Sequence, residues 1–303
     1  MSDIKEKKES KPILLQKRDQ IFLLHLYDLQ FLDVEYLQNN LYKNSKAFVY
    51  RRMKSLEEEG YIQSFRVPIL ELNNGQSKNV YALGKRGANE VKALLGEVDW
   101  RYDIVSRTPS HIYHQLLLAH VRAAFDESFA TNEEEQVPKH ETYTLAQYLN
   151  EKRGYFKYDP KEYVKPRVQE SFSIRPDGVL ILKNKKTERY QPFFIELERS
   201  YQSKETTMKK LERYNSYCQL ELYKEEHRAY DYPVGKPRVL FISYKENGVD
   251  RLLDHSKNVD TSATAGVLYT TYEEIINGPY EKIFYAKDSS NPDQTYSLVS
   301  KVE

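Results

Sequence analysis

Three acidic residues on two neighbouring apolar segments are the candidates for chemistry: Asp177, Glu196 and Glu198. Two β-rich runs, at residues 174–182 and 191–199, flank a polar stretch at residues 183–189 that predicts a hairpin loop. Opposed residues of an antiparallel hairpin have numbers of constant sum, so Asp177 is expected across from Glu196. Side chains alternate along a strand, so Glu196 and Glu198 share a face. The three carboxylates should therefore converge, and a divalent cation would relieve their mutual repulsion.

The pattern Pro176-Asp177 followed by Glu196-Leu197-Glu198 resembles the core hairpin of the PD-(D/E)xK nuclease superfamily. The resemblance implies that Asp177 and Glu196 are catalytic and hold Mg²⁺ or Mn²⁺ through oxygen, the ligand that these ions prefer. The superfamily pattern has lysine where this chain has Glu198, which is expected to be a third ligand or a general base. Such a metal would lower the pKa of bound water and stabilise charge on a phosphate.

A cation for this acidic group has to come from elsewhere, because Glu198 stands at the lysine position. Lys204 and Lys210 of the following helical segment are the candidates, and Lys210 is included among the predicted catalytic residues. Arg199 is a poor substitute, since in a strand it points to the opposite face from Glu198. The alternative without chemistry is a salt-bridge network of the acids with Arg175, Arg199 and Lys210.

The elements around the hairpin predict an α/β domain at residues 111–303. A helix capped by Ser110 precedes the hairpin, residues 131–170 are expected to be irregular, and helix, strand, helix and strand follow (residues 201–223, 238–244, 249–256 and 266–271). This order predicts a mixed sheet with helices on both faces. It is also the order of the restriction-endonuclease-like core of the PD-(D/E)xK superfamily.

The N-terminal part predicts three helices followed by a hairpin. Helical signals begin at Leu14, Asp33 is a good N-cap for a second helix after a turn at Phe31-Leu32, and Ser45 starts a third that Gly60 ends. Two strands and a tip containing Asn-Gly then close the unit. This arrangement is typical of a winged helix-turn-helix.

The third helix predicts a DNA-contacting surface. Its apolar positions face the core, whereas the chain carries no acid between residues 43 and 56. Cations bind phosphates and longer side chains reach base edges in the major groove. The residues predicted to contact double-stranded DNA are those of this helix and its hairpin, namely Lys43, Lys46, Tyr50, Arg51, Arg52, Lys54, Arg66 and Lys78. The alternative is a solvated helix face, as most charge runs are.

Composition limits the remaining possibilities. The 303 residues carry a net charge of +1, so nucleic-acid binding has to be local. One cysteine, Cys218, excludes an internal disulfide framework and predicts a cytoplasmic location. No apolar run is long enough to span a membrane, and no phosphate-binding loop motif occurs. The expected organisation is a disordered tail (1–13), a winged helix-turn-helix domain (14–98), a linker (99–110) and a nuclease-like domain (111–303).

Taken together, these segments resemble the replication-relaxation family of Gram-positive plasmids, phages and integrative elements. The resemblance covers roughly residues 15–290 and rests on the winged helix and on five short motifs in order, beginning at His114, Arg175, Phe194, Lys210 and Tyr269. It implies a mobile-element setting, with replication or conjugation proteins as partners. A homodimer through the predicted helix at 84–95 is a further possibility.

Two functions follow from these observations. In the first, the protein binds DNA of a mobile element through its winged helix, and the nuclease-like domain does not cleave. In the second, the same helix targets a Mg²⁺- or Mn²⁺-dependent endonuclease or nickase that uses Asp177, Glu196 and Glu198. A relaxase with a tyrosine nucleophile is a weaker third alternative, because the sequence has no His-x-His metal motif.

Overall fold

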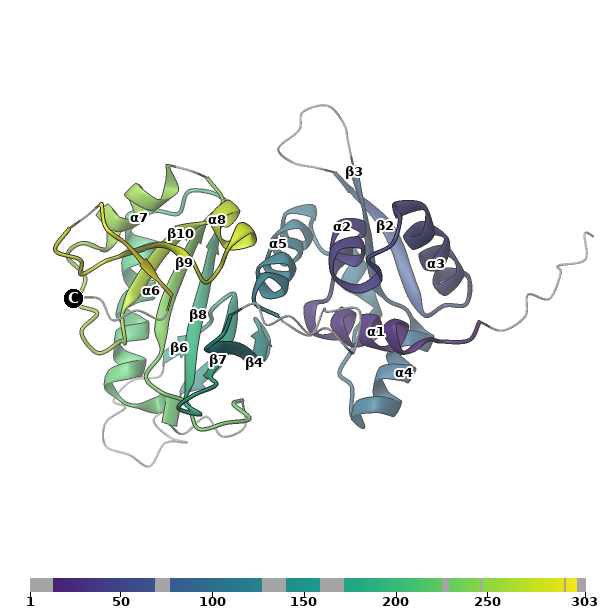
Figure 1. Cartoon of the computed structure of the whole chain (residues 1–303), viewed down its shortest axis with the longest axis horizontal. Coiled ribbons are helices and arrows are strands. Elements are labelled where there is room, and N and C mark those ends of the chain that lie inside the picture. The colour runs from purple at the N-terminus through teal and green to yellow at the C-terminus, as the bar shows by residue number, and fades with distance from the viewer. Residues whose placement is uncertain are drawn as a thin grey trace, which may run out of the picture. The chain divides into compact units, whose positions relative to one another are not determined.

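The computed structural model describes residues 13–68, 77–126, 140–158, 172–224, 229–245, 247–291 and 293–298. The chain forms two compact units, Met1–Leu116 and Leu117–Glu303. Figure 1 shows the elements of both, and each unit is described by itself. The predicted N-terminal tail, the tip of the first hairpin and the predicted loop at residues 133–135 lie outside the described residues.

The first unit contains the predicted three helices and returning hairpin. Its elements are α1 (Lys17–Leu29), β1 (Leu32–Asp33), α2 (Val34–Tyr36), η1 (Leu37–Tyr42), α3 (Lys46–Glu58), β2 (Ile62–Pro68), β3 (Ser77–Leu83) and α4 (Lys85–Leu95). Asp33 caps α2 as predicted, since its Oδ1 accepts a bond from Tyr36 N at 2.8 Å. The predicted turn at Phe31-Leu32 is wrong, because Leu32 and Asp33 pair with Tyr81 and Val80 as a short third strand.

Local sequence fixes both ends of α3. The Ser45 hydroxyl accepts a bond from Phe48 N at 3.3 Å, which satisfies one amide of the first turn. At the other end, Gly60 adopts a φ of 74°, and its N–H donates to the Glu57 carbonyl at 2.8 Å. The next amide, Tyr61 N, reaches back to the Leu56 carbonyl at 2.9 Å and completes a Schellman ending. The helix therefore begins and ends as the sequence predicted.

Residues 97–116 complete the first unit. Trp100, Ile104 and Val105 lie against a cluster that Phe31, Val67, Val80, Ala82, Ile112 and Leu116 form. Helix α5 (Pro109–Phe125) starts one residue before the predicted cap. Thr108 supplies the cap instead of Ser110, since its Oγ1 accepts a bond from His111 N at 3.3 Å. Proline suits the first helical position because it has no amide hydrogen to satisfy.

A seven-stranded mixed sheet organises the second unit. Its order is β12-β11-β10-β9-β8-β7-β4, where β4 is Tyr143–Asn150, β7 Gly178–Asn184, β8 Tyr190–Glu198, β9 Arg238–Ser243, β10 Val267–Thr271, β11 Lys282–Ala286 and β12 Thr295–Ser297. The central strands β8, β9 and β10 run parallel, and the outer pairs are antiparallel. The short strands β5 (Phe156–Tyr158) and β6 (Phe172–Ile174) form a separate pair.

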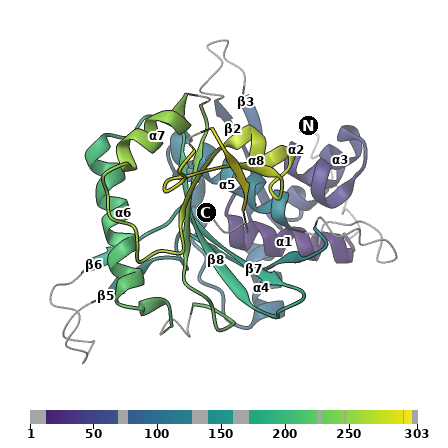
Figure 2. The ribbon, with the colours of Figure 1, turned by 60° about the vertical axis from the view of Figure 1, so that its left-hand side comes forward.

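Helices cover both faces of this sheet. Helices α6 (Lys204–Gln219) and α7 (Gly248–Ser256) connect the parallel strands and share one core with Phe194, Phe241 and Tyr269. Helix α8 (Tyr272–Asn277) and the second half of α5 lie on the other side (Figures 1 and 2). The connections from β8 through α6 to β9, and from β9 through α7 to β10, step across the sheet in the same direction. Right-handed connections of this kind place both helices on the same face of the sheet, as observed. The predicted fold class, α/β with helices on both faces, is confirmed.

The prediction of an irregular segment at 131–170 is wrong where the structure describes it, because β4 and β5 form there. Strand β4 is an edge strand with a bulge between Leu145 and Gln147, which interrupts its alternation. The Gln147 side chain crosses to the segment beside it: Nε2 donates to the Ala229 carbonyl and Oε1 accepts from Asp231 N, both at 3.1 Å. Strands β11 and β12 were also absent from the prediction.

Candidate functional site

The hairpin of β7 and β8 brings Asp177 and Glu196 together. The register pairs Gly178 with Ile195, so Asp177 stands opposite Glu196 and the predicted pairing is confirmed. Asp177 is fixed by its own backbone and by its carboxylate: its N–H donates to the Ile195 carbonyl at 2.9 Å, and its Oδ2 accepts from Leu197 N at 2.8 Å. Its side chain is half-buried, so one acid of the pair is accessible from outside.

Glu196 is buried, with 2% of its surface exposed, and helix α6 supplies its partners. Lys210 Nζ lies 2.5 Å from Glu196 Oε2, and the Tyr214 hydroxyl donates to Oε1. Burial raises the pKa of Glu196 to about 7, and the nearby charge of Asp177 adds to that rise, while Lys210 and Tyr214 act against it. Glu196 therefore changes its protonation state near neutral pH.

Lys210 is the cation of this pair and remains protonated. Burial lowers the pKa of Lys210, but the charges of Glu196 and Asp177 outweigh that effect and raise it overall. The Tyr214 pKa is also raised, first by burial and then by Glu196. Lys210 and Tyr214 are one turn apart in α6, so a single helix face approaches the acid pair. This arrangement offers two carboxylates and one ammonium at one place.

Glu198 lies on the same sheet face but has a different environment. Arg251 of α7 binds its Oε2, and Oε1 accepts a bond from Gln202 N at 2.8 Å. Burial lowers the pKa of Arg251, which stays a cation. Among the described residues, Asp177, Glu196 and Glu198 do not form a group whose ligand atoms all lie within 4.8 Å of one another. The expected convergence of three carboxylates is not met, because Arg251 holds Glu198 apart from the pair.

The other cations weighed for this site have partners elsewhere. Lys204 lies 3.7 Å from Asp254, and Arg175 lies 2.7 Å from Glu151. Lys210 alone of the candidate lysines contacts the acid pair. Sequence reasoning missed Tyr214 and Arg251 as partners of the acids. A signal for Tyr214 existed, since it follows Lys210 by four residues on a helix; no local pattern marks Arg251.

The exposed face of α3 carries four of the eight residues predicted to contact DNA. Val49, Met53 and Leu56 are buried, whereas the side chains of the opposite face and of its flanks are exposed, namely those of Lys43, Lys46, Tyr50, Arg51, Lys54 and Arg66. Lys54 lies 3.9 Å from Glu58, a weak surface pair. The face therefore offers cations and an aromatic ring to solvent.

Arg52 is not part of that face. Its guanidinium binds the carboxylate of Asp19, which is 0% exposed, and its Nη2 donates to the Leu14 carbonyl at 3.0 Å. The Tyr42 hydroxyl donates to the same carboxylate at 2.9 Å. The Asp19 hydrogen bond is the main cause that raises the pKa of Arg52. The structure contradicts the assignment of Arg52 to DNA contact, because it joins α3 to α1.

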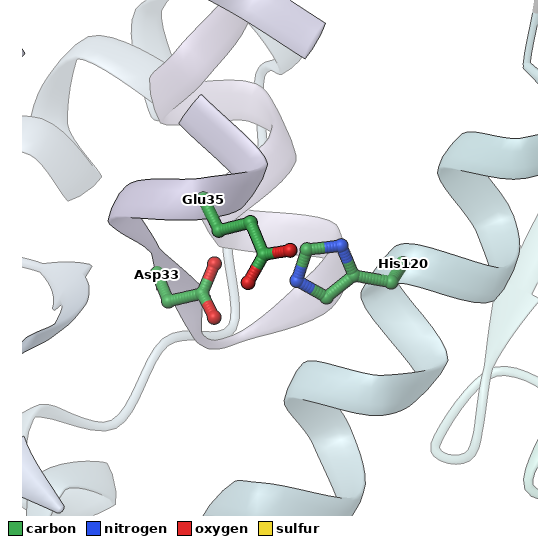
Figure 3. Close-up of side chains that lie close together, drawn as sticks. All are labelled: Asp33, Glu35 and His120. Carbon is green, nitrogen blue, oxygen red and sulfur yellow. The ribbon is translucent and has the colours of Figure 1, made fainter. Parts of the chain in front are cut away.

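Lys78 is also placed differently from the prediction. Its Nζ lies 3.3 Å from Asp33 Oδ2 and 3.5 Å from Glu35 Oε2, so the cap residue of α2 and an acid of its first turn offset its charge. Figure 3 shows these two carboxylates, at the cap and in the first turn of α2, in a view that also includes His120 of α5. A lysine held by two carboxylates is a poor phosphate contact, so Arg66 is the better candidate on the hairpin.

The geometry defines a two-unit α/β protein in which a helix-and-hairpin unit with a basic helix face precedes a sheet holding an acid–lysine pair. The family model described as Replication-relaxation matches residues 23–231, which is more than half of the chain. The chain belongs to the replication-relaxation family. The match includes α3 as well as Asp177, Glu196 and Lys210.

Comparison with solved structures gives weaker likenesses. A structure of restriction endonuclease FokI matches at 15% identity and a TM-score of 0.26, covering 88% of this chain and 45% of that one. A structure of FokI bound to DNA matches at 14% identity and a TM-score of 0.24, covering 86% and 43%. This chain thus spans less than half of FokI, and TM-scores this low carry no argument about function. No curated protein matches the sequence. In the described residues, no helix is long and apolar enough to cross a membrane.

Proposed function

We propose that this protein binds double-stranded DNA of a plasmid, phage or integrative element of a Gram-positive bacterium through helix α3, in the manner of a winged helix. The family setting supports the mobile element. The single observation that carries the DNA contact is the exposed face of α3, on which Lys46, Arg51 and Lys54 stand around Tyr50. Such a protein would work in the cytoplasm beside replication or conjugation proteins.

The dimensions and chemistry of α3 suit the major groove. Its 13 residues extend about 20 Å, and the groove admits one helix across its width. Lys46 and Lys54 are placed for phosphates, while Arg51 and Tyr50 project from the middle of the same face, where base edges would lie. Three buried residues hold the other face, and the Arg52–Asp19 pair fixes the helix on α1. The surface is therefore presented on a rigid support.

The test is DNA affinity as a function of salt for a double variant, Arg51→Ala with Lys54→Ala. Each cation that neutralises a phosphate contributes about 0.9 to the slope of log affinity against log salt, so the loss of Lys54 should take about 0.9 from that slope. The loss of Arg51 should weaken binding further through its base contact. Binding of a labelled duplex is followed by fluorescence anisotropy at low and moderate salt. The matched control is Lys85→Ala with Lys92→Ala, two exposed lysines of α4 with the same change in charge.

The expected result is weaker binding and a shallower slope for the α3 variant, with the α4 variant close to wild type. Equal losses in both variants would mean that the affinity follows total charge. Unchanged affinity of the α3 variant at every salt concentration would remove α3 from the DNA contact. Either result contradicts the assignment.

A second function, cleavage or nicking of DNA with Mg²⁺ or Mn²⁺, has one observation in its favour. Asp177 and Glu196 offer oxygen ligands side by side, which fits the preference of these ions. A metal held by these residues would supply an activated water and stabilise charge on a phosphate. Lys210 would be the cation that faces the phosphate, and Tyr214 would hold the Glu196 carboxylate in place. Glu198 is not required, because it is already bound to Arg251.

Nicking of supercoiled plasmid tests this second function. Wild-type protein is incubated with Mg²⁺ or Mn²⁺ beside Asp177→Asn, Glu196→Gln and a control, Glu212→Gln, which alters an exposed acid of α6. Nicking that both site variants lose and the control retains would support the enzyme. Absence of turnover with either metal would refute it and leave DNA binding as the function.

A further inference from the structure

An exposed tyrosine beside two cations lies at the edge of the sheet where the acid pair is found. Tyr201, in the loop between β8 and α6, is 56% exposed. Lys245 Nζ and Arg251 Cζ each lie 4.7 Å from the centroid of its ring. Cations at this distance orient an aromatic ring without burying it. The side chain is therefore held in place while much of its surface remains accessible.

The position of Tyr201 relates it to the acid pair. It follows Glu198, the last residue of β8, by three positions, and Lys245 follows the last residue of β9 by two. Strands β8 and β9 are parallel neighbours, so both loops leave the same edge of the sheet. Asp177 immediately precedes β7, which runs antiparallel to β8, and so stands at that edge too. Ligands of open α/β sheets bind at the carboxyl ends of the parallel strands.

The charges around the ring are not equivalent. Arg251 is bound to Glu198, and its Nη1 donates to the Gln202 carbonyl at 3.0 Å, so it serves to hold the loop. Lys204 nearby is offset by Asp254. Lys245 is exposed and forms no salt bridge with any residue in the described ranges. Its ammonium can therefore bind an external anion.

A second ring–cation pair precedes Asp177 in the sequence, and its cation, Arg175, is also bound to Glu151. Tyr155 is 47% exposed, and Arg175 Cζ lies 6.0 Å from its ring centroid. Arg175 precedes Asp177 by two residues, so this pair also belongs to the edge where β7 begins. Exposed rings beside cations thus occur in the segments on both sides of the acid pair.

We propose that Tyr201 and Lys245 bind single-stranded DNA, with a base stacked on the Tyr201 ring and a neighbouring phosphate on Lys245. The proposal rests on the DNA-binding function above and adds a second, separate contact to it. Every base presents a face that can stack on a tyrosine, whereas bases inside a duplex are covered by their neighbours. The site should therefore prefer unpaired strands, such as those exposed when a duplex is opened beside the acid pair.

The test uses the full chain carrying Arg51→Ala and Lys54→Ala, so that α3 does not dominate the signal. Binding of a short labelled oligo(dT) is measured by fluorescence anisotropy in EDTA. Tyr201→Ala should weaken binding about tenfold or more, the effect of losing one stacked base, whereas Tyr201→Phe should retain it. Lys245→Ala should weaken binding and reduce the salt slope by about 0.7, with Lys257→Ala, an exposed lysine after α7, as control.

Three outcomes would overturn the proposal: no binding of oligo(dT) by the parent protein, equal binding by Tyr201→Ala, or a loss in Tyr201→Phe as large as in Tyr201→Ala. Tighter binding of oligo(rU) than of oligo(dT) would replace DNA by RNA as the ligand. Duplex binding by Tyr201→Ala in an otherwise wild-type chain separates the two proposals, because the proposed duplex contact is made by α3 with Arg66 and does not include Tyr201. Loss of oligo(dT) binding with duplex binding intact is the expected result.

Discussion

Replacing Lys210 by methionine should destabilise the second unit in a pH-dependent manner. Lys210 Nζ is 2.5 Å from Glu196 Oε2, and Glu196 is 2% exposed, so the variant leaves a buried carboxyl without its cation. Methionine keeps the length and most of the apolar contacts of the lysine stem. The variant therefore isolates the charge. An uncompensated buried carboxylate is costly, and Glu196 will take up a proton instead.

The size of the effect follows from the pKa of Glu196. In the wild type it is about 7 in the folded protein against a reference value of 4.5, so this group makes stability fall as pH rises from 4.5 to 7 and level off above that. Lys210 is one of the groups that lower this pKa, so the variant should have a higher one. Stability of the variant should then keep falling above pH 7, by about 1.4 kcal/mol per pH unit. The Lys210 pKa is itself raised, so lysine does not titrate in this range.

The assay is urea denaturation followed by far-UV circular dichroism at pH 6 and pH 8. We expect the free energy of unfolding lost in Lys210→Met to be about 1 to 2 kcal/mol larger at pH 8 than at pH 6. Lys209→Met, one residue away and exposed beside Glu205, should change it by less than about 0.5 kcal/mol at either pH. The fluorescence of Trp100, the single tryptophan, follows the first unit and should not change. Equal losses at both pH values would refute the reasoning.

Three further predictions test other parts of the structure. Arg52→Ala removes the cation that pairs with buried Asp19 and should destabilise the first unit by about 3 kcal/mol. The loss is measured by urea titration followed by tryptophan fluorescence, and a loss below about 0.5 kcal/mol would contradict this prediction. Gly87→Ala would place a Cβ 2.1 Å from the Tyr61 carbonyl oxygen and should cost about 2 kcal/mol, and an unchanged melting temperature would argue against that close packing. Mn²⁺ should raise the melting temperature of the wild type but not that of Asp177→Asn. The rise should be larger at pH 8 than at pH 6, because the buried carboxyl of Glu196, with a pKa of about 7, must lose its proton to bind the metal. Equal shifts in both proteins would exclude this metal site.

Features set by local sequence were predictable. The hairpin register followed from one polar loop between two apolar runs, and it placed Asp177 opposite Glu196 as observed. The ends of α3 followed from Ser45 and Gly60, whose roles depend only on backbone geometry within a few residues. Burial of one α3 face followed from helical periodicity.

Features set by partners far along the chain were not predictable. Arg52 and Arg51 are adjacent cations on one helix, and only the packing of α1 decides that Arg52 meets Asp19. Glu198 looked like a third metal ligand because strand alternation puts it beside Glu196. Arg251, which neutralises it, comes from a helix 53 residues later. Strand β4 escaped detection because its bulge breaks the alternation by which strands are recognised.

The bulged edge strand has a consequence for the behaviour of the protein in concentrated solution. An open strand edge is a template on which further chains can add, and long edges of this kind promote fibrous aggregation. Here the bulge between Leu145 and Gln147 twists strand β4 at the edge where another chain would have to pair. The bulge therefore helps to keep neighbouring molecules from joining their sheets.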